Sequence, residues 1–175
     1  VNGKDTAVQS GIAVQAAETT ENVVAKVGNT EYPSLPAALS AAQDGDTVTL
    51  LADHVTDKDD ASTLAVVTKK LTLDLNGFTV DYLMVGEPTY GEENGDEPVD
   101  VTITSGSLTI KDSSTSADGG VDQIAFMSGT LNIAGAIAGE IDCAAENSGE
   151  NIISETKYGG KVTISGGAVH GLHVQ

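Results

Sequence analysis

Short runs of alternating apolar and polar residues dominate the chain from residue 46 onward. Four of these runs share a strand-and-turn form, and they read LTLDLNG at 71–77, SLTIKDS at 107–113, TLNIAGA at 130–136 and KVTISGG at 161–167. A side-chain period of two is typical of a β-strand with one buried face. The runs recur at intervals of roughly 23 to 37 residues, which is the range of stacked repeats. The pattern therefore predicts that Leu73, Ile110, Ile133 and Ile164 point inward and stack in a common core.

The segment 6–17 also alternates, and it reads TAVQSGIAVQAA. Its apolar face carries Val8, Ile12 and Val14, and the polar stretch ETTEN separates it from the rest of the chain. A terminal strand on such a tether needs a sheet edge, either in its own domain or in a neighbour. We therefore expect residues 1–22 to form a strand and tether that supply an assembly contact through Val8, Ile12 and Val14.

Two further elements are predicted before the repeats begin. The stretch 23–32 contains Gly28-Asn29 between two β-forming runs, which is a hairpin signal. Ser34 and Pro36 are suited to the first turn of a helix at about 34–43, whose apolar face is short. Such a helix is marginal alone, so we expect it to cap the open end of the stacked strands.

Together, the hairpin, the Ala-rich helix ending at Gly45-Asp46, the strand TVTLL, and the runs LTLDLNG, GSLTIKDSS and GGKVTISGGAV resemble a known family. They are similar to right-handed parallel β-helix domains of bacterial secreted and cell-surface proteins, in the pectin-lyase-like class. The resemblance covers about residues 23–175. It implies an all-β solenoid with an N-terminal strand or hairpin and one capping α-helix, located outside the cell or on its surface. Short strands with frequent turns also fit an antiparallel sandwich, but the recurring unit favours the β-helix.

The chain departs from the enzymes of that class. Their pectate lyases generally use Arg or Lys as the base beside calcium, and this sequence contains no Arg. Their pectin hydrolases use Asp residues with a Gly-His-Gly motif, whereas the nearest string here is His170-Gly171-Leu172-His173. We therefore predict no catalytic residue, no cofactor and no enzymatic activity.

Charge and composition argue against several classes of binding partner. With 26 acidic and 8 basic residues, the net charge is −18, which repels nucleic acid, anionic lipid and acidic polysaccharide. The chain has no apolar run long enough for a membrane span. The lone Cys143 has no partner for an internal disulfide, and its apolar flanks favour a partly buried, unreactive thiol.

The acidic loops offer two interpretations. Asp53, Asp57, Asp59 and Asp60 crowd one loop, as in a calcium site, but their spacing is not that of an EF-hand. The stretch 86–100 is a second acidic loop, predicted to bulge out of the strand stack as an insertion. We favour solvated loops as the interpretation of both acidic stretches, and calcium binding stays open as the alternative. His54, His170 and His173 have no zinc-ligand spacing, so no metal residue is predicted. Asp74-Leu75-Asn76-Gly77 is predicted to form a turn rather than a catalytic site.

These observations favour a non-enzymatic structural or adhesive module. Its expected partner is itself, head to tail in a filament, or another cell-surface component. Three alternatives stay open: a carbohydrate-binding adhesin, a polysaccharide lyase or hydrolase, and a fragment of a longer β-helix whose next coil was cut away.

Overall fold

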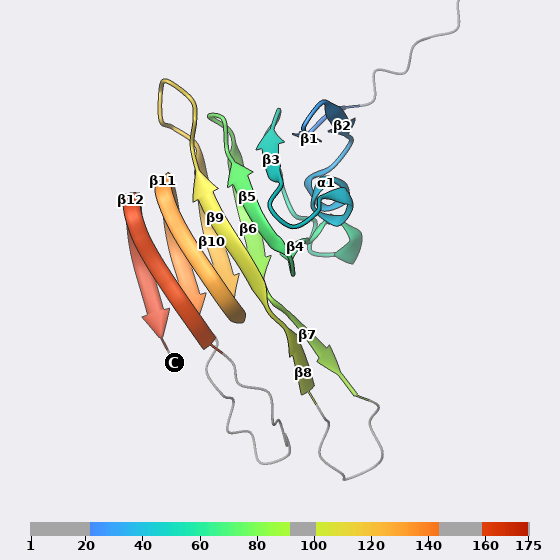
Figure 1. Cartoon of the computed structure of the whole chain (residues 1–175), viewed down its shortest axis with the longest axis vertical. Helices are drawn as coiled ribbons and strands as arrows, with labels where there is room; N and C mark the ends of the chain where they lie inside the picture. Colours follow the sequence, from blue (N-terminus) through green and yellow to red (C-terminus); the bar gives the residue numbers. More distant parts are fainter. Residues whose placement is uncertain (1–21, 92–100, 144–158, 175) are drawn as a thin grey trace, which may run out of the picture.

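A computed structural model describes residues 22–91, 101–143 and 159–174. One large sheet curls around a single hydrophobic core, and a short helix covers one of its ends (Figure 1). The sheet runs in the order β2-β1-β3-β5-β9-β11-β10-β6-β4, with β12 paired to β11 off this path.

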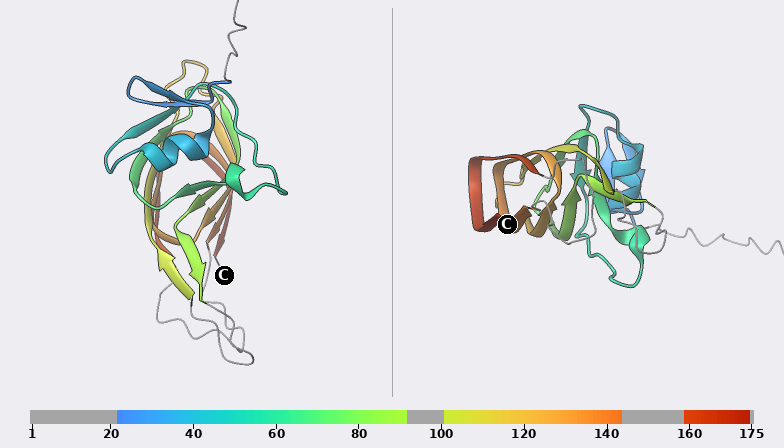
Figure 2. Two further views of the ribbon diagram at one scale, coloured as in Figure 1. Left: turned by 90° about the vertical axis from the view of Figure 1, so that its right-hand side faces the viewer. Right: turned by 90° about the horizontal axis from the view of Figure 1, so that it is seen from below.

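Two walls of stacked strands face each other across the core (Figure 2). The first wall is formed by β3 (Thr47–Leu50), β5 (Lys70–Asp74), β9 (Gly106–Lys111) and the first parts of β11 (Ser128–Cys143) and β12 (Gly159–Val174). The second wall is formed by β4 (Ala65–Val67), β6 (Thr79–Val85), β10 (Gly120–Phe126) and the later parts of β11 and β12. The long strands β11 and β12 belong to both walls and join them.

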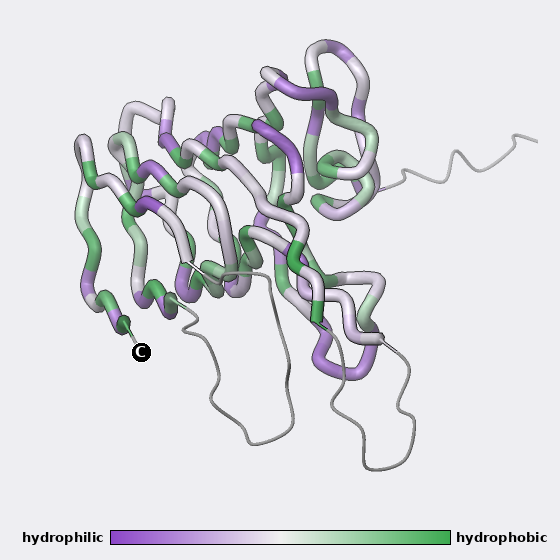
Figure 3. The backbone as a smooth tube through the Cα atoms, turned by 60° about the horizontal axis from the view of Figure 1, so that its bottom comes forward, coloured by the Kyte–Doolittle hydropathy of each residue, from purple (hydrophilic) through white to green (hydrophobic). Residues whose placement is uncertain are grey.

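The predicted core stack is confirmed at three of its four positions. Leu73 pairs with Ile110, Ile110 with Ile133 and Ile133 with Ile164, all in parallel register. The first three side chains are fully buried, whereas Ile164 is 50% exposed. Figure 3 shows hydrophobic positions recurring in the successive strands of this stack.

The expectation of a right-handed parallel β-helix solenoid is wrong. The sheet is mixed: β1 (Ala25–Val27) pairs antiparallel with β2 (Thr30–Tyr32) and with β3, and the parallel strands curl into a half-barrel. A separate antiparallel hairpin of β7 (Glu87–Tyr90) and β8 (Val101–Thr104) projects from the stack (Figure 1). Alternation fixes which side of a strand is buried, but it does not fix strand direction or how the sheet closes.

The local predictions near the N-terminal end agree with the structure. The hairpin turns at Gly28-Asn29, where Gly28 has a φ of 57°. Helix α1 (Leu35–Ala41) begins at Ser34, whose Oγ accepts a hydrogen bond of 3.2 Å from the amide of Ala37. The helix is shorter than the predicted 34–43, because Ala42 already has an extended backbone. A single 3₁₀ turn, Ala61–Thr63, lies in the following loop.

The later elements differ more from expectation. The stretch 86–100, predicted as a loop insertion, contains strand β7, and β12 extends ten residues beyond the predicted 161–164. The predicted strand at 151–154 lies outside the described residues, as does residue 175. No helix in the described part of the chain has the length and apolar character needed to cross a membrane.

Candidate functional site

The outermost strand, β12, has a free edge. It pairs with β11 from Gly159 to Val174 in parallel register, and among the described residues no strand pairs with its other side. Its backbone amides and carbonyls on that side are therefore available to another strand. The edge spans both walls at the end of the stack that is remote from α1 (Figure 1).

Side chains on the inner face of β12 are exposed, although their neighbours one strand below are buried. Ile133 is fully buried and its partner Ile164 is 50% exposed; Ile141 is fully buried and its partner Leu172 is 49% exposed. Val174, at the end of the second wall, is 75% exposed. We call Val162, Ile164, Val169, Leu172 and Val174 the open rung, because they point toward the core with nothing described above them. The open rung is an apolar surface bordered by unpaired backbone.

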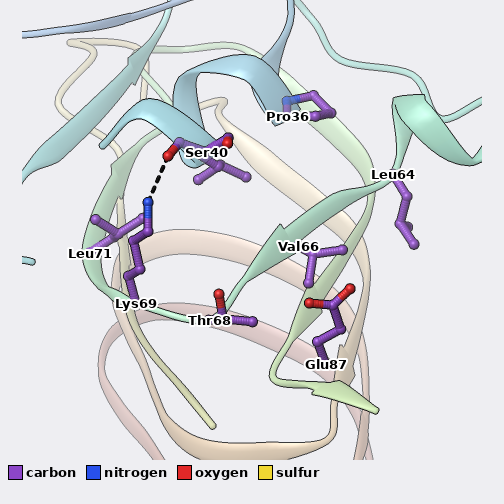
Figure 4. A pocket seen from close by; sticks show the side chains of 9 residues that line it. Pro36, Ser40, Leu64, Val66, Thr68, Lys69, Leu71 and Glu87 are labelled. Carbon is purple, nitrogen blue, oxygen red and sulfur yellow. Dashed lines mark hydrogen bonds between the residues drawn. The ribbon is translucent and has the colours of Figure 1, made fainter. Parts of the chain in front are cut away.

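The other end of the stack is covered. Helix α1 contacts β4 and β1, and Leu35 and Ala38 on the helix are fully buried. Lys69 Nζ donates hydrogen bonds of 2.6 and 2.7 Å to the carbonyls of Ser40 and Ala42, where the helix ends. Figure 4 shows the bond to Ser40. These contacts satisfy backbone carbonyls that a helix terminus otherwise leaves unpaired. The two ends of the molecule are thus chemically different.

A small hollow of about 240 Å³ lies beside α1 (Figure 4). Leu39, Leu64 and Val66 supply its apolar lining, and Lys69 and Glu87 are its charged residues. Because Lys69 is engaged with the helix carbonyls, it is not free to bind an anion. We therefore assign this hollow to the packing of the cap.

A larger hollow of about 510 Å³ lies on the outer face of the second wall, and we call it the Tyr82 hollow. Tyr82 of β6 and Gln123 of β10 are register partners on its floor, and the loop 56–61 forms its rim. The Gln123 amide donates a 2.8 Å hydrogen bond to Asp142. Burial and the negative charge of Asp142 raise the pKa of the Tyr82 phenol, so the hydroxyl stays protonated.

Several polar atoms in the Tyr82 hollow lack partners. The Oγ1 atom of Thr56 is buried without a hydrogen bond. Asp57 and Asp60 each accept local amide hydrogen bonds through Oδ1, and no bond within the described structure reaches their Oδ2 atoms. The hollow thus combines an aromatic ring with free hydrogen-bonding groups.

The other acidic residues mainly hold turns. Asp74 accepts hydrogen bonds from the amides of Asn76 and Ser113 and pairs with Lys111 at 3.1 Å. The predicted turn is confirmed, since Asn76 and Gly77 have positive φ angles of 49° and 86°. Asp112 accepts hydrogen bonds from the amides of Gly77, Ser114 and Gly119. These carboxylates tie two loops together.

No metal site is assembled by the residues that the structure describes. Asp53 accepts a hydrogen bond from the amide of Thr79, and in the residues described no group of three potential ligands gathers. His54 is buried beside β6, while His170 and His173 lie exposed on β12. Cys143 is a free, partly buried thiol whose pKa is raised by burial and by Asp142.

The predicted assembly residues Val8, Ile12 and Val14 lie outside the described residues. Sequence reasoning did not identify the open rung, because it placed Ile164 in the core and ended the strand at that residue. It also did not identify the Tyr82 hollow, whose parts come from a loop and two strands distant in sequence. The sequence signal that could have pointed to the open rung is the alternation of Val162 and Ile164 with polar residues in the last repeat.

Comparison with protein-family models, with curated proteins and with solved structures finds no match for this chain. No family is therefore assigned. The expectation of a secreted or cell-surface protein depends on the sequence resemblance alone and stays a prediction.

Proposed function

We propose that this chain is a non-enzymatic structural module that assembles head to tail through the free edge of β12. The observation that carries the proposal is the open rung. Buried side chains repeat in register along the stack, and within the described part of the chain the same face meets solvent only at β12. A further strand placed on β12 continues both the backbone ladder and the core.

The apolar surface exposed on the open rung determines how much binding free energy the partner must supply. Full burial of an Ile, Leu or Val side chain contributes about 1.5–3 kcal/mol, so covering the half-exposed Ile164 and Leu172 and the more exposed Val174 contributes about 3–5 kcal/mol. Association costs about 4–15 kcal/mol. The rung alone therefore offsets at most the lower end of this cost, and the partner must add main-chain hydrogen bonds and apolar side chains of its own.

The arrangement of titratable groups supports a non-enzymatic role. The carboxylates whose pKa is lowered, among them Asp74 and Asp112, are turn residues held by backbone amides. We expect no release of unsaturated or reducing sugar from pectin, polygalacturonate or neutral glycans above a buffer control. Release that is abolished by changing one acidic residue contradicts this expectation.

Light scattering coupled to size exclusion, followed by negative-stain microscopy, tests the assembly. The molar mass is expected to rise with concentration, and Ile164→Asp is expected to keep the protein monomeric. Thr163→Asp is the matched control, because it adds the same charge to the next residue on the outer side of the same strand. The proposal fails if the unchanged protein is monomeric at its highest soluble concentration, or if both variants weaken assembly equally.

A second candidate function is the binding of a neutral saccharide in the Tyr82 hollow. The free carboxylate oxygens of Asp57 and Asp60 are groups that sugar hydroxyls hydrogen-bond to, and the ring of Tyr82 offers an apolar face on which a sugar ring packs. Saturation-transfer NMR with cellotriose and maltotriose tests it. Tyr82→Ala should abolish the signal, whereas Tyr90→Ala, at a 65% exposed tyrosine on β7, should preserve it. Absence of signal with both trisaccharides excludes this candidate.

A further inference from the structure

We propose that the strand that fills the β12 edge is the segment 6–17 of a second copy, added in parallel with Ile12 beside Val162 and Val14 beside Ile164. This inference rests on the proposed function, and it names the partner. The register matches the apolar alternation of the segment to that of the first wall, where Leu131 and Ile133 lie beside Val162 and Ile164.

A column of glycines sets where the pairing begins. Gly106, Gly129 and Gly160 are register partners at the corner of successive strands. A Cβ atom at Gly160 would lie 2.0 Å from the carbonyl oxygen of Gly129, so only glycine fits when the chain bends at this corner. Ser10 lacks that freedom, and the pairing therefore starts after it, with Gly11 to Gln15 beside Lys161 to Ser165.

Charge favours this segment over the rest of a second copy. Residues 6–17 contain no charged side chain, whereas the whole chain has a net charge of −18. Most surfaces of a second copy are therefore repelled by the first. An uncharged strand approaches the edge without that penalty, and it places Ile12 and Val14 on the open rung.

The length of the tether disfavours the edge of the same molecule, which is reached only by a fully extended chain. Val24 is fixed beside β1 by a 3.0 Å hydrogen bond from its amide to the carbonyl of Tyr32. Nine residues from Gln15, the last paired residue, to Val24 span at most about 30–32 Å when fully extended. From β1 to a strand beyond β12 there are six strand spacings across the first wall, or roughly 29 Å at about 4.8 Å each. Figures 1 and 2 show β1 and β12 at opposite ends of the stack.

The nearer edge, on β2, is a poor alternative. It offers only the three residues Thr30–Tyr32, and Thr30 and Glu31 are polar and exposed. Pro33 follows at once and has no amide hydrogen to donate. A segment with a continuous apolar face gains little there, so a second copy is the better acceptor.

The donor segment 6–17 and the acceptor edge of β12 are different parts of the chain, so the contact between two copies is heterologous. Each copy that donates its segment leaves its own β12 edge free for the next copy, and the product is a filament instead of a closed dimer.

Two full-length variants test the assignment by complementation. Ile12→Asp with Val14→Asp disables the donor face, and Ile164→Asp disables the acceptor. Each variant alone is expected to be monomeric, and an equimolar mixture is expected to form a one-to-one heterodimer and nothing larger. Ala13→Asp with Gln15→Asp is the control, because it adds the same charges to the opposite face of the segment and should preserve assembly.

A cross-link tests the register in a Cys143→Ser background. A protein with Ala13→Cys and a second protein with Thr163→Cys should form a mixed disulfide on oxidation, since the two residues face each other on the outer side. Val14→Cys in place of Ala13→Cys points to the opposite face and should reduce the yield at least tenfold.

The possible outcomes separate the two proposals. If the donor variant assembles like the unchanged protein while Ile164→Asp does not, the β12 edge functions in assembly and the segment 6–17 is not its partner. If the mixture of donor and acceptor variants stays monomeric, the donor assignment is likewise overturned. If the unchanged protein never assembles, both proposals fail.

Discussion

Replacing Ile133 by Ala tests whether the stacked core holds this fold together. Ile133 is fully buried between Ile110 and Ile164 in the first wall. The substitution removes three carbon groups at about 0.8 kcal/mol each, or about 2.4 kcal/mol of transfer free energy. A residual cavity raises the cost, so we expect the free energy of unfolding to fall by about 3–4 kcal/mol. In a chain of this size the melting temperature then falls by roughly 6–16 °C.

Ile164→Ala is the matched comparison, since it is the same change on the same face one strand further out. Because Ile164 is already 50% exposed, we expect a loss of only about 1 kcal/mol and no cavity. Both variants are compared by urea unfolding in the Ile12→Asp, Val14→Asp background, so that assembly does not cover Ile164. Equal losses at the two positions would show that the stack has no buried interior at Ile133, and the reasoning would be wrong.

Three further predictions concern single side chains. Asp112→Asn should lower the free energy of unfolding by about 1–3 kcal/mol, because it weakens hydrogen bonds from three backbone amides. Burial alone would raise the pKa of Asp112, but the hydrogen bonds from the amides of Ser114, Gly119 and Gly77 lower it overall. The contribution of Asp112 to the free energy of unfolding should therefore disappear as the pH falls below about 4. Urea titrations from acid to neutral pH measure the effect of the substitution and its pH dependence. Burial lowers the pKa of His54, so the folded protein keeps the imidazole neutral. Its contribution to the free energy of unfolding should be complete above about pH 6.5 and decline as the pH falls toward the lowered pKa. His54→Gln should remove this pH dependence of stability, measured by the same urea titrations. The raised pKa of Cys143 should make its reaction with a thiol reagent at pH 7 slower in the native protein than in urea, and equal rates would contradict the burial.

Local features of this fold are readable from sequence because they depend on neighbouring residues. Alternation placed Leu73, Ile110 and Ile133 in the core, and Ser34 and Gly28-Asn29 marked a helix start and a hairpin turn. Each of these follows from a side-chain period or from the φ angle that a residue adopts. No knowledge of distant segments is needed for such features.

The larger features depend on contacts between distant segments. Ile164 has the same pattern as Ile133, and only the absence of a described strand beyond it makes it exposed. The antiparallel start at β1 and the curl of the sheet are not encoded in alternation, which is why the β-helix expectation failed. The Tyr82 hollow joins Thr56, Tyr82 and Gln123, whose proximity arises only when β6 and β10 pair.

The contrast between the two ends of the stack bears on why the β12 edge is open. Proteins usually protect a sheet edge with proline, with inward-pointing charge or with a covering element. At one end α1 covers the core, and Lys69 satisfies its last carbonyls. Strand β12 contains no proline, and its inner face carries Val162, Ile164 and Leu172 without a charge. The net charge of −18 meanwhile opposes side-by-side contact between copies. An end left apolar on a molecule whose sides repel permits association along one axis only, so raising the salt concentration should add lateral bundling without being needed for the end-to-end contact.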